Sequence, residues 1–285
     1  MNTALRMLAK TALLSVLFLL GGCEEYALFD PKGPIGEEEK WLIIMSFLVM
    51  MIVVIPVYFM VFWFPYRYRK SNDKSTYAPD WEHSNAIEVV VWTIPLLIII
   101  ALGIITYKTS HSLDPRKALT SDKPAITVQV VSLDWKWLFI YPEYEIATIN
   151  EMAMPVNTPV EFLITSDTVM NSFFIPRLGS QIYAMSGMEN RLFLEASEEG
   201  VYRGISANYS GFGFSGMKFK AHATSDQGFQ QWIEKVKRSP DTLGKAEYTA
   251  LTAKTKDHDV EYFANVNPLL FNSIIEKYTG AQNGQ

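Results

Sequence analysis

The chain has 285 residues, of which 49% are apolar and only 19% are charged, against about 25% charged residues in an average globular protein. This balance excludes an intrinsically disordered chain, and the net charge of −5 argues against a nucleic-acid-binding protein, which needs a basic surface. The only cysteine is Cys23, so an intramolecular disulfide and a cluster of thiolates around a metal ion are both excluded.

Residues 1–22 have the layout of a secretory signal peptide. Arg6 and Lys10 precede an apolar run over 12–20, which is too short to span a bilayer comfortably. The run ends in Leu-Gly-Gly-Cys23, which resembles a bacterial lipobox, where the cysteine is acylated and becomes the mature N-terminus. The alternative is a signal peptide that ends near a cysteine by chance. We expect a lipoprotein that begins at acylated Cys23.

Two longer apolar segments predict transmembrane helices over 41–64 and 87–107. Segment 41–64 holds no charged residue, and a helix of this length reaches about 36 Å, enough to cross a hydrocarbon core of roughly 30 Å. Aromatic residues near the ends of both segments are typical of the membrane–water interface. Pro56 and Pro95 lie inside these segments, and membrane helices tolerate proline.

The charges around these segments predict their orientation. Segment 23–40 is acidic and follows the acylated end, whereas the connection 65–86 carries Arg67, Arg69, Lys70 and Lys74. Because cytoplasmic loops are enriched in lysine and arginine, we place 65–86 in the cytoplasm. The N-terminal segment and everything after the second span are then periplasmic, as in a multi-pass lipoprotein of the bacterial inner membrane.

After a linker over 108–123, the pattern changes to that of a β-rich domain over 124–224. Apolar residues alternate with other residues in short runs such as 217–223, and turn signals recur at short intervals. Such a pattern predicts an antiparallel sandwich or barrel. Apolar residues then recur at helical spacing, so we expect a C-terminal helical region over 225–285.

The order of these segments and several motifs resemble subunit II of the haem–copper respiratory oxidases. His83–Pro95 resembles the entry to that family's second helix, with its Glu and Trp-Thr-x-Pro, and Trp135–Trp137 resembles an aromatic strand of its periplasmic domain. Segments 166–176 and 202–217 resemble its two metal-ligand loops. The resemblance implies the fold class: a two-helix transmembrane hairpin plus a periplasmic all-β cupredoxin-like sandwich with C-terminal helices.

In the cytochrome c oxidases of this family, the two loops hold a dinuclear copper A centre, whose thiolate, imidazole and thioether ligands suit copper. Serine, asparagine and phenylalanine stand at all but one of the matching positions here, so the resemblance implies a chain without a metal site. The remaining position keeps a methionine, which we expect to pack in the core. In chain order, the degenerate copper A positions hold Asn171, Ser206, Asn208, Ser210, Phe214 and Met217.

The resemblance is therefore to the quinol-oxidising, cytochrome bo type of branch. Ubiquinol is lipid-soluble and can reduce a haem within the membrane directly, so no copper relay from cytochrome c is needed. This implies a subunit without cofactors in a proton-pumping ubiquinol oxidase. The implied partners are a subunit I that carries the haems and copper B, other subunits, membrane lipids and ubiquinol, but not cytochrome c. The alternatives are a copper A subunit of cytochrome c oxidase and a free-standing membrane-anchored cupredoxin-like lipoprotein.

Glu88 begins the second span, where a charged side chain is costly and usually functional. By resemblance, it lies at the entrance of a proton channel into subunit I. The alternative is a capping box, in which Asn85 is the N-cap and Glu88 the third helical residue. We expect Trp135 and Trp137 to be packing residues, and His222 to face solvent.

Overall fold

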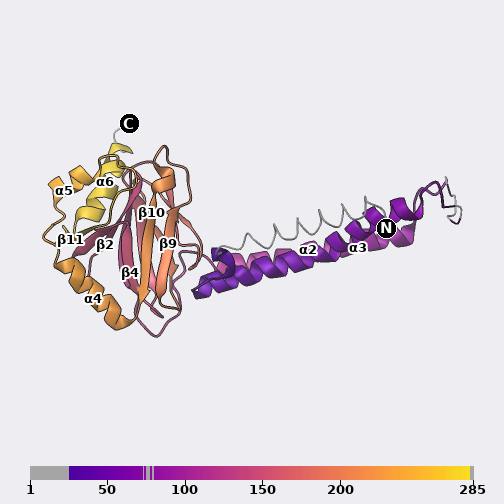
Figure 1. Cartoon of the computed structure of the whole chain (residues 1–285), viewed down its shortest axis with the longest axis horizontal. Coiled ribbons are helices and arrows are strands. Elements are labelled where there is room, and N and C mark those ends of the chain that lie inside the picture. Colours follow the sequence, from indigo (N-terminus) through magenta and orange to yellow (C-terminus); the bar gives the residue numbers. More distant parts are fainter. Residues whose placement is uncertain (1–25, 73, 75–77, 79, 283–285) are drawn as a thin grey trace, which may run out of the picture.

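The structure is a computed structural model that describes residues 26–72, 74, 78 and 80–282, so the predicted signal peptide and Cys23 lie outside it. Two long helices, α2 (Pro34–Arg67) and α3 (Asn85–Ser112), form a hairpin that projects from a β-rich domain (Figure 1). Both helices are long and apolar enough to cross a membrane. They contain the predicted spans and extend beyond them, because the polar residues that flank each span continue the helix.

The domain beyond α3 consists of two β-sheets with helices on its outer side (Figure 1). The six-stranded sheet has the order β11-β3-β2-β1-β5-β8, and the five-stranded sheet has the order β4-β10-β9-β6-β7. Most neighbouring strands are antiparallel, but β1 pairs in parallel with β5, and β4 with β10. The strands are β1 (Ile126–Leu133), β2 (Lys136–Tyr141), β3 (Ile146–Ile149), β4 (Glu151–Pro155), β5 (Val160–Ser166), β6 (Asn171–Phe174), β7 (Ile182–Ala184), β8 (Asn190–Leu194), β9 (Gly200–Ser206), β10 (Lys218–Thr224) and β11 (Glu261–Ala264).

Strand β2 shows why the six-stranded sheet is buried on both faces. Alternate side chains of a strand point to opposite faces. Trp137 and Phe139 belong to the core between the two sheets, whereas Leu138 and Ile140 belong to a second core under the C-terminal helices. A strand buried on both faces reads as a continuous apolar run, as this one does.

We expected the C-terminal region to be helical, but it also contains a strand. It contains α4 (Asp226–Lys237), α5 (Lys245–Leu251) and α6 (Leu270–Gln282), but β11 lies between the last two helices and pairs with β3 at the edge of the sheet. Four residues are too few to show strand periodicity in the sequence. The pairing with β3 is therefore what makes this segment a strand.

Buried polar side chains of the β-domain hold this C-terminal region in place. Lys136 is 1% exposed, and its ammonium group donates to the carbonyl oxygen of Ala253 at 2.8 Å and to Oγ1 of Thr255 at 2.6 Å. Burial lowers the pKa of Lys136. In a second such contact, the buried carboxylate of Asp167 accepts hydrogen bonds from Tyr248 and Lys277, both at 2.7 Å.

Glu151 at the start of β4 forms a third such contact. Its Oε1 accepts hydrogen bonds from the Tyr262 hydroxyl of β11 and the Trp232 indole of α4, and its Oε2 lies 3.3 Å from Nε2 of His222. Lys235 in turn donates to the Tyr262 hydroxyl at 2.9 Å. Burial acts to raise the pKa of Glu151, but the hydrogen bonds and the neighbouring cations outweigh it and hold that pKa below its ordinary value.

Glu151→Gln is expected to destabilise the β-domain at neutral pH by about 1.5–3 kcal/mol, because hydrogen bonds to a charged group contribute about that much. Since the pKa of Glu151 is lowered by folding, its contribution is present above the ordinary glutamate pKa of about 4.3 and is lost as pH falls through the folded value. Denaturant midpoints followed by tryptophan fluorescence should therefore differ between wild type and variant at neutral pH and converge in acid. Glu143→Gln, at an exposed position in the turn between β2 and β3, is the matched control and should leave the midpoint unchanged.

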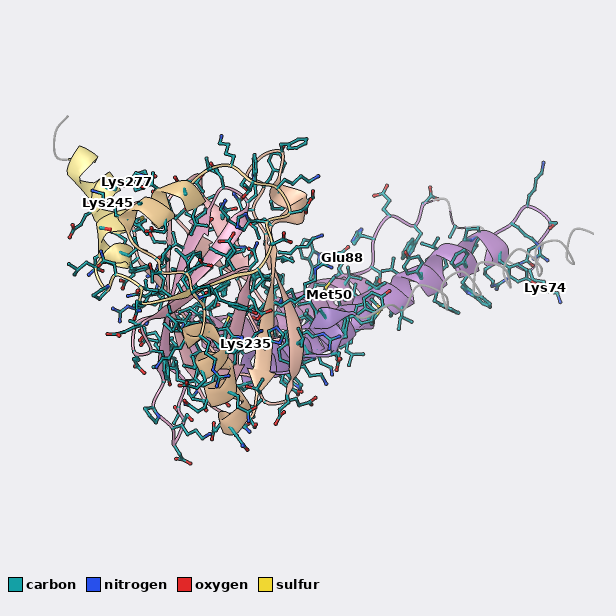
Figure 2. All side chains as sticks on the ribbon, turned by 60° about the vertical axis from the view of Figure 1, so that its left-hand side comes forward. Met50, Lys74, Glu88, Lys235, Lys245 and Lys277 are labelled. Carbon is teal, nitrogen blue, oxygen red and sulfur yellow. The ribbon has the colours of Figure 1, made fainter. Side chains whose placement is uncertain are left out.

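The junction, which we define as residues 30–36, fixes the hairpin to the β-domain. Backbone hydrogen bonds join the Lys32 N–H to the Arg177 carbonyl at 2.6 Å and the Ser197 N–H to the Lys32 carbonyl at 2.7 Å. Gly33 is required by close approach, since a Cβ there would lie 2.2 Å from the Glu195 carbonyl oxygen. The far end of the hairpin, marked by Lys74, lies away from the domain (Figure 2).

Candidate functional site

The degenerate copper A positions lie together at one end of the five-stranded sheet. Asn171 starts β6, Ser206 ends the neighbouring β9, and the connection from β9 to β10 carries the remaining positions. This connection contains a short 3-10 helix, η2 (Phe214–Gly216). The pairing of β6 with β9 explains why two loops far apart in the sequence meet here.

The side chains of Asn171 and Ser206 form a hydrogen bond with each other. The Ser206 hydroxyl donates to Oδ1 of Asn171 at 2.9 Å, and both residues are buried. The Asn171 amide donates to the carbonyl oxygen of Val169 at 3.1 Å, and the Asn208 amide donates to that of Met170 at 3.1 Å. Hydrogen bonds among the chain's own polar groups therefore tie the first loop to the second.

The other positions are held by backbone and aromatic contacts. The Ser210 carbonyl accepts a hydrogen bond from the Trp135 indole at 3.0 Å, whereas the Ser210 hydroxyl is buried without a hydrogen-bond partner among the described residues. The half-buried Phe214 ring lies edge-on to Tyr209, with 5.6 Å between ring centroids. Met217 is 1% exposed and packs in the core, and its carbonyl accepts from the Ser206 N–H at 3.1 Å.

This set of groups does not fit a dinuclear copper centre. Copper A needs soft thiolate and imidazole donors, but these positions offer hydroxyl and amide groups, an aromatic ring and one thioether. His222 on β10 does not supply the missing imidazole, because its Nε2 lies 3.3 Å from Oε2 of Glu151 on β4. We expected His222 to face solvent. His222 does lie on the face of β10 opposite to the buried Phe219, Ala221 and Ala223, but it is only 28% exposed there, because its ring lies against Glu151.

The two tryptophans lie in different environments. Trp137 is fully buried, with its ring 5.4 Å from that of Phe173. The motif suggested that Trp135 lies on a strand. It lies instead in the turn that joins β1 to β2, with a φ of 65°. Its ring packs so closely on Gly213 that a Cβ there would lie 2.3 Å away. The Trp135 side chain thus packs against the second loop. No local sequence pattern indicates a tryptophan at positive φ, so this contact could not be predicted.

Glu88 lies in the first turns of α3 and its side chain is exposed. The capping box, which was the alternative explanation for Glu88, is not formed. The residue before the helix is Ser84, not Asn85, and the Ser84 side chain makes no capping hydrogen bond. Glu88 is thus the fourth helical residue, and its N–H donates to the Ser84 carbonyl at 2.9 Å.

Comparisons with known proteins show what the chain is similar to. The family of the periplasmic domain of cytochrome c oxidase subunit II matches residues 142–224, and the COX aromatic rich motif matches residues 237–282. The crystal structure of the periplasmic domain of subunit II of cytochrome oxidase from Bradyrhizobium japonicum aligns with 42% of this chain and 96% of that chain, at 22% identity and a TM-score of 0.39.

Sequence relatives extend over nearly the whole chain. Cytochrome bo(3) ubiquinol oxidase subunit 2 of Pseudomonas aeruginosa is 56% identical over 265 residues, which cover 93% of this chain and 80% of that protein. Ubiquinol oxidase subunit 2 of Acetobacter aceti is 55% identical over 280 residues, which cover 97% of this chain and 90% of that protein. With these relatives and with the fold described above, the chain belongs to the family of ubiquinol oxidase subunit 2 of the haem–copper oxidases.

Proposed function

We propose that this chain is the subunit without a redox centre in a proton-pumping ubiquinol oxidase of the respiratory chain. Electrons pass from ubiquinol to haems and copper B in subunit I, and oxygen is reduced to water there. One observation carries this proposal: the Ser206 hydroxyl and the Asn171 amide occupy a thiolate and an imidazole position and bond to each other at 2.9 Å. No cytochrome c is needed, and none is bound.

As a member of this family, the chain is one subunit of an oxidase complex, and its two spans and periplasmic domain fit the inner membrane. Within that complex, the hairpin contacts subunit I and membrane lipids. The support is its surface: the apolar stretches of α2 and α3 are exposed in the isolated chain, and helices that are apolar all round are buried in a bilayer or against other helices. We expect the structural and assembly role of the chain to come from this surface.

Glu88 takes protons at the cytoplasmic end of α3. Its carboxylate is exposed on the surface of a membrane helix, where an ionisable group is costly and therefore usually functional. The Ser84 boundary removes the capping box as an explanation for this residue. The proposed role is the entrance of the proton channel that leads into subunit I.

Purification of the tagged chain from its native membrane tests this function. We expect a stable complex that carries haem, oxidises ubiquinol and consumes oxygen, but does not oxidise reduced cytochrome c. Oxidation of reduced cytochrome c would favour a copper A subunit instead. A chain recovered alone, without haem, would favour a free-standing lipoprotein.

The mature chain is expected to begin at acylated Cys23, because the lipobox-like sequence ends at the only cysteine of the chain. Intact-mass analysis of the purified subunit should give the mass of residues 23–285 plus that of the acyl groups. Cys23→Ser is the control, and should lose both the acyl mass and cleavage at this site. An unmodified wild-type chain that starts at Met1 would contradict the prediction.

A further inference from the structure

Three apolar side chains lie exposed at the beginning of the described chain. They belong to η1 (Ala27–Phe29) and the residue before it: Tyr26, Leu28 and Phe29 are 58%, 44% and 49% exposed. The rings of Tyr26 and Phe29 meet edge to face, with 6.2 Å between their centroids. Together they form a small apolar surface at this end of the described chain.

This surface lies beside the first turns of α2, just before the uncharged part of that helix. The described chain starts, in indigo, beside the first turns of α2 (Figure 1). Trp41, 57% exposed, begins the uncharged part of α2, about 10 Å along the axis from Pro34. Exposed Glu37 and Glu38 lie between them and place this level among polar headgroups rather than in hydrocarbon. Tyrosine and tryptophan are enriched at this depth, since one end of each ring system is apolar and the other polar.

The junction holds η1 at this level. Two ion pairs add to its backbone hydrogen bonds: Asp30 with Arg177 at 3.0 Å, and Lys32 with Glu198 at 2.8 Å. The residues that follow η1 are thus fixed to the β-domain, and η1 presents its apolar side chains from a rigid support. A rigid support lowers the conformational entropy that a membrane contact would cost.

We propose that Tyr26, Leu28 and Phe29 form a lipid-contacting surface that inserts among the headgroups and upper acyl chains of the periplasmic leaflet. Phospholipid is the favoured partner because the surface continues the aromatic belt that begins at Trp41. It is also too small for a specific protein interface, which needs about 800 Å² on each partner. The contact sets the depth of the hairpin in the bilayer. It goes beyond the proposed function and holds whether or not Cys23 is acylated.

A spin label at Leu28 tests the proposal in the whole oxidase complex, reconstituted in phospholipid vesicles. Leu28→Cys is labelled with a nitroxide, and its collisions with oxygen, which concentrates in lipid, are compared with those with a water-soluble nickel chelate. Phe29→Cys gives a second, independent position on the same surface. Lys245→Cys is the aqueous control, because this exposed residue lies at the end of the domain away from the hairpin (Figure 2). The labelled wild-type complex corrects for Cys23 and for cysteines of other subunits.

We expect the ratio of oxygen to nickel accessibility at Leu28 and Phe29 to be several-fold higher than at Lys245. A ratio equal to that at Lys245 would show that η1 faces water, and would overturn the proposal. Low accessibility to both reagents, with an immobilised spectrum, would show that another subunit covers η1, and would overturn it too. Haem content and turnover of each labelled complex establish that the variant has assembled.

Discussion

Five substitutions are expected to turn this chain into a purple copper protein: Asn171→His, Ser206→Cys, Asn208→Glu, Ser210→Cys and Phe214→His. Hydrogen bonds already join Ser206 to Asn171 and to the Met217 carbonyl, and the short connection between β9 and β10 carries the other positions. New thiolate and imidazole groups would therefore lie within reach of shared metal ions. The full-length variant, purified in detergent, should bind about two copper ions per chain and show intense visible absorption.

The wild-type chain is the reference for this experiment, and is expected to retain no copper by elemental analysis after copper addition and desalting. A variant that carries only Asn171→His, Asn208→Glu and Phe214→His is the matched control, since it restores nitrogen and oxygen donors without thiolates. It should remain without the intense visible band. Stoichiometric copper with such a band in the wild-type chain would overturn the proposal of a quinol oxidase. It would also show that the ligand positions are assigned wrongly.

The membrane part of the fold and the meeting of the two loops could be predicted from the sequence. Uncharged runs of about 20 residues have one stable solution in a bilayer, so α2 and α3 follow from composition alone. The two loops meet because β6 pairs with β9, an arrangement that the family resemblance implied. What replaces the metal could not be predicted, since the bond between Ser206 and Asn171 depends on how two buried side chains are oriented.

Two other features could not be predicted from the sequence. Ser84 and Asn85 are both good N-cap residues, so the sequence could not decide between them, and the choice changes the helical position of Glu88. The burial of Lys136 could not be predicted, because lysine is almost never fully buried without a partner. Its partners, Ala253 and Thr255, come from a distant segment that the sequence does not connect to it.

Glu88→Ala is expected to slow oxygen consumption per haem several-fold while the complex still assembles. The carboxylate is exposed on α3, so its removal leaves no cavity in this chain. Its helix-dipole contribution is at most about 0.3–1 kcal/mol, too little to prevent assembly. If the group passes protons into subunit I, alanine removes that step. Glu88→Gln keeps the size of the side chain but cannot ionise, so it should also be slow, and Glu88→Asp should retain more activity.

Oxygen consumption normalised to haem separates this role from a structural one. Glu82→Ala is the matched control, because Glu82 is exposed in the connection just before α3 and should be dispensable. A residue that only stabilised the helix would lower the yield of complex but not the turnover of each assembled complex. Unchanged turnover per haem in both Glu88→Ala and Glu88→Gln would therefore refute the proton-uptake role. A rate loss shared by Gln and Ala, but smaller with Asp, would follow from the loss of a titratable group at this position.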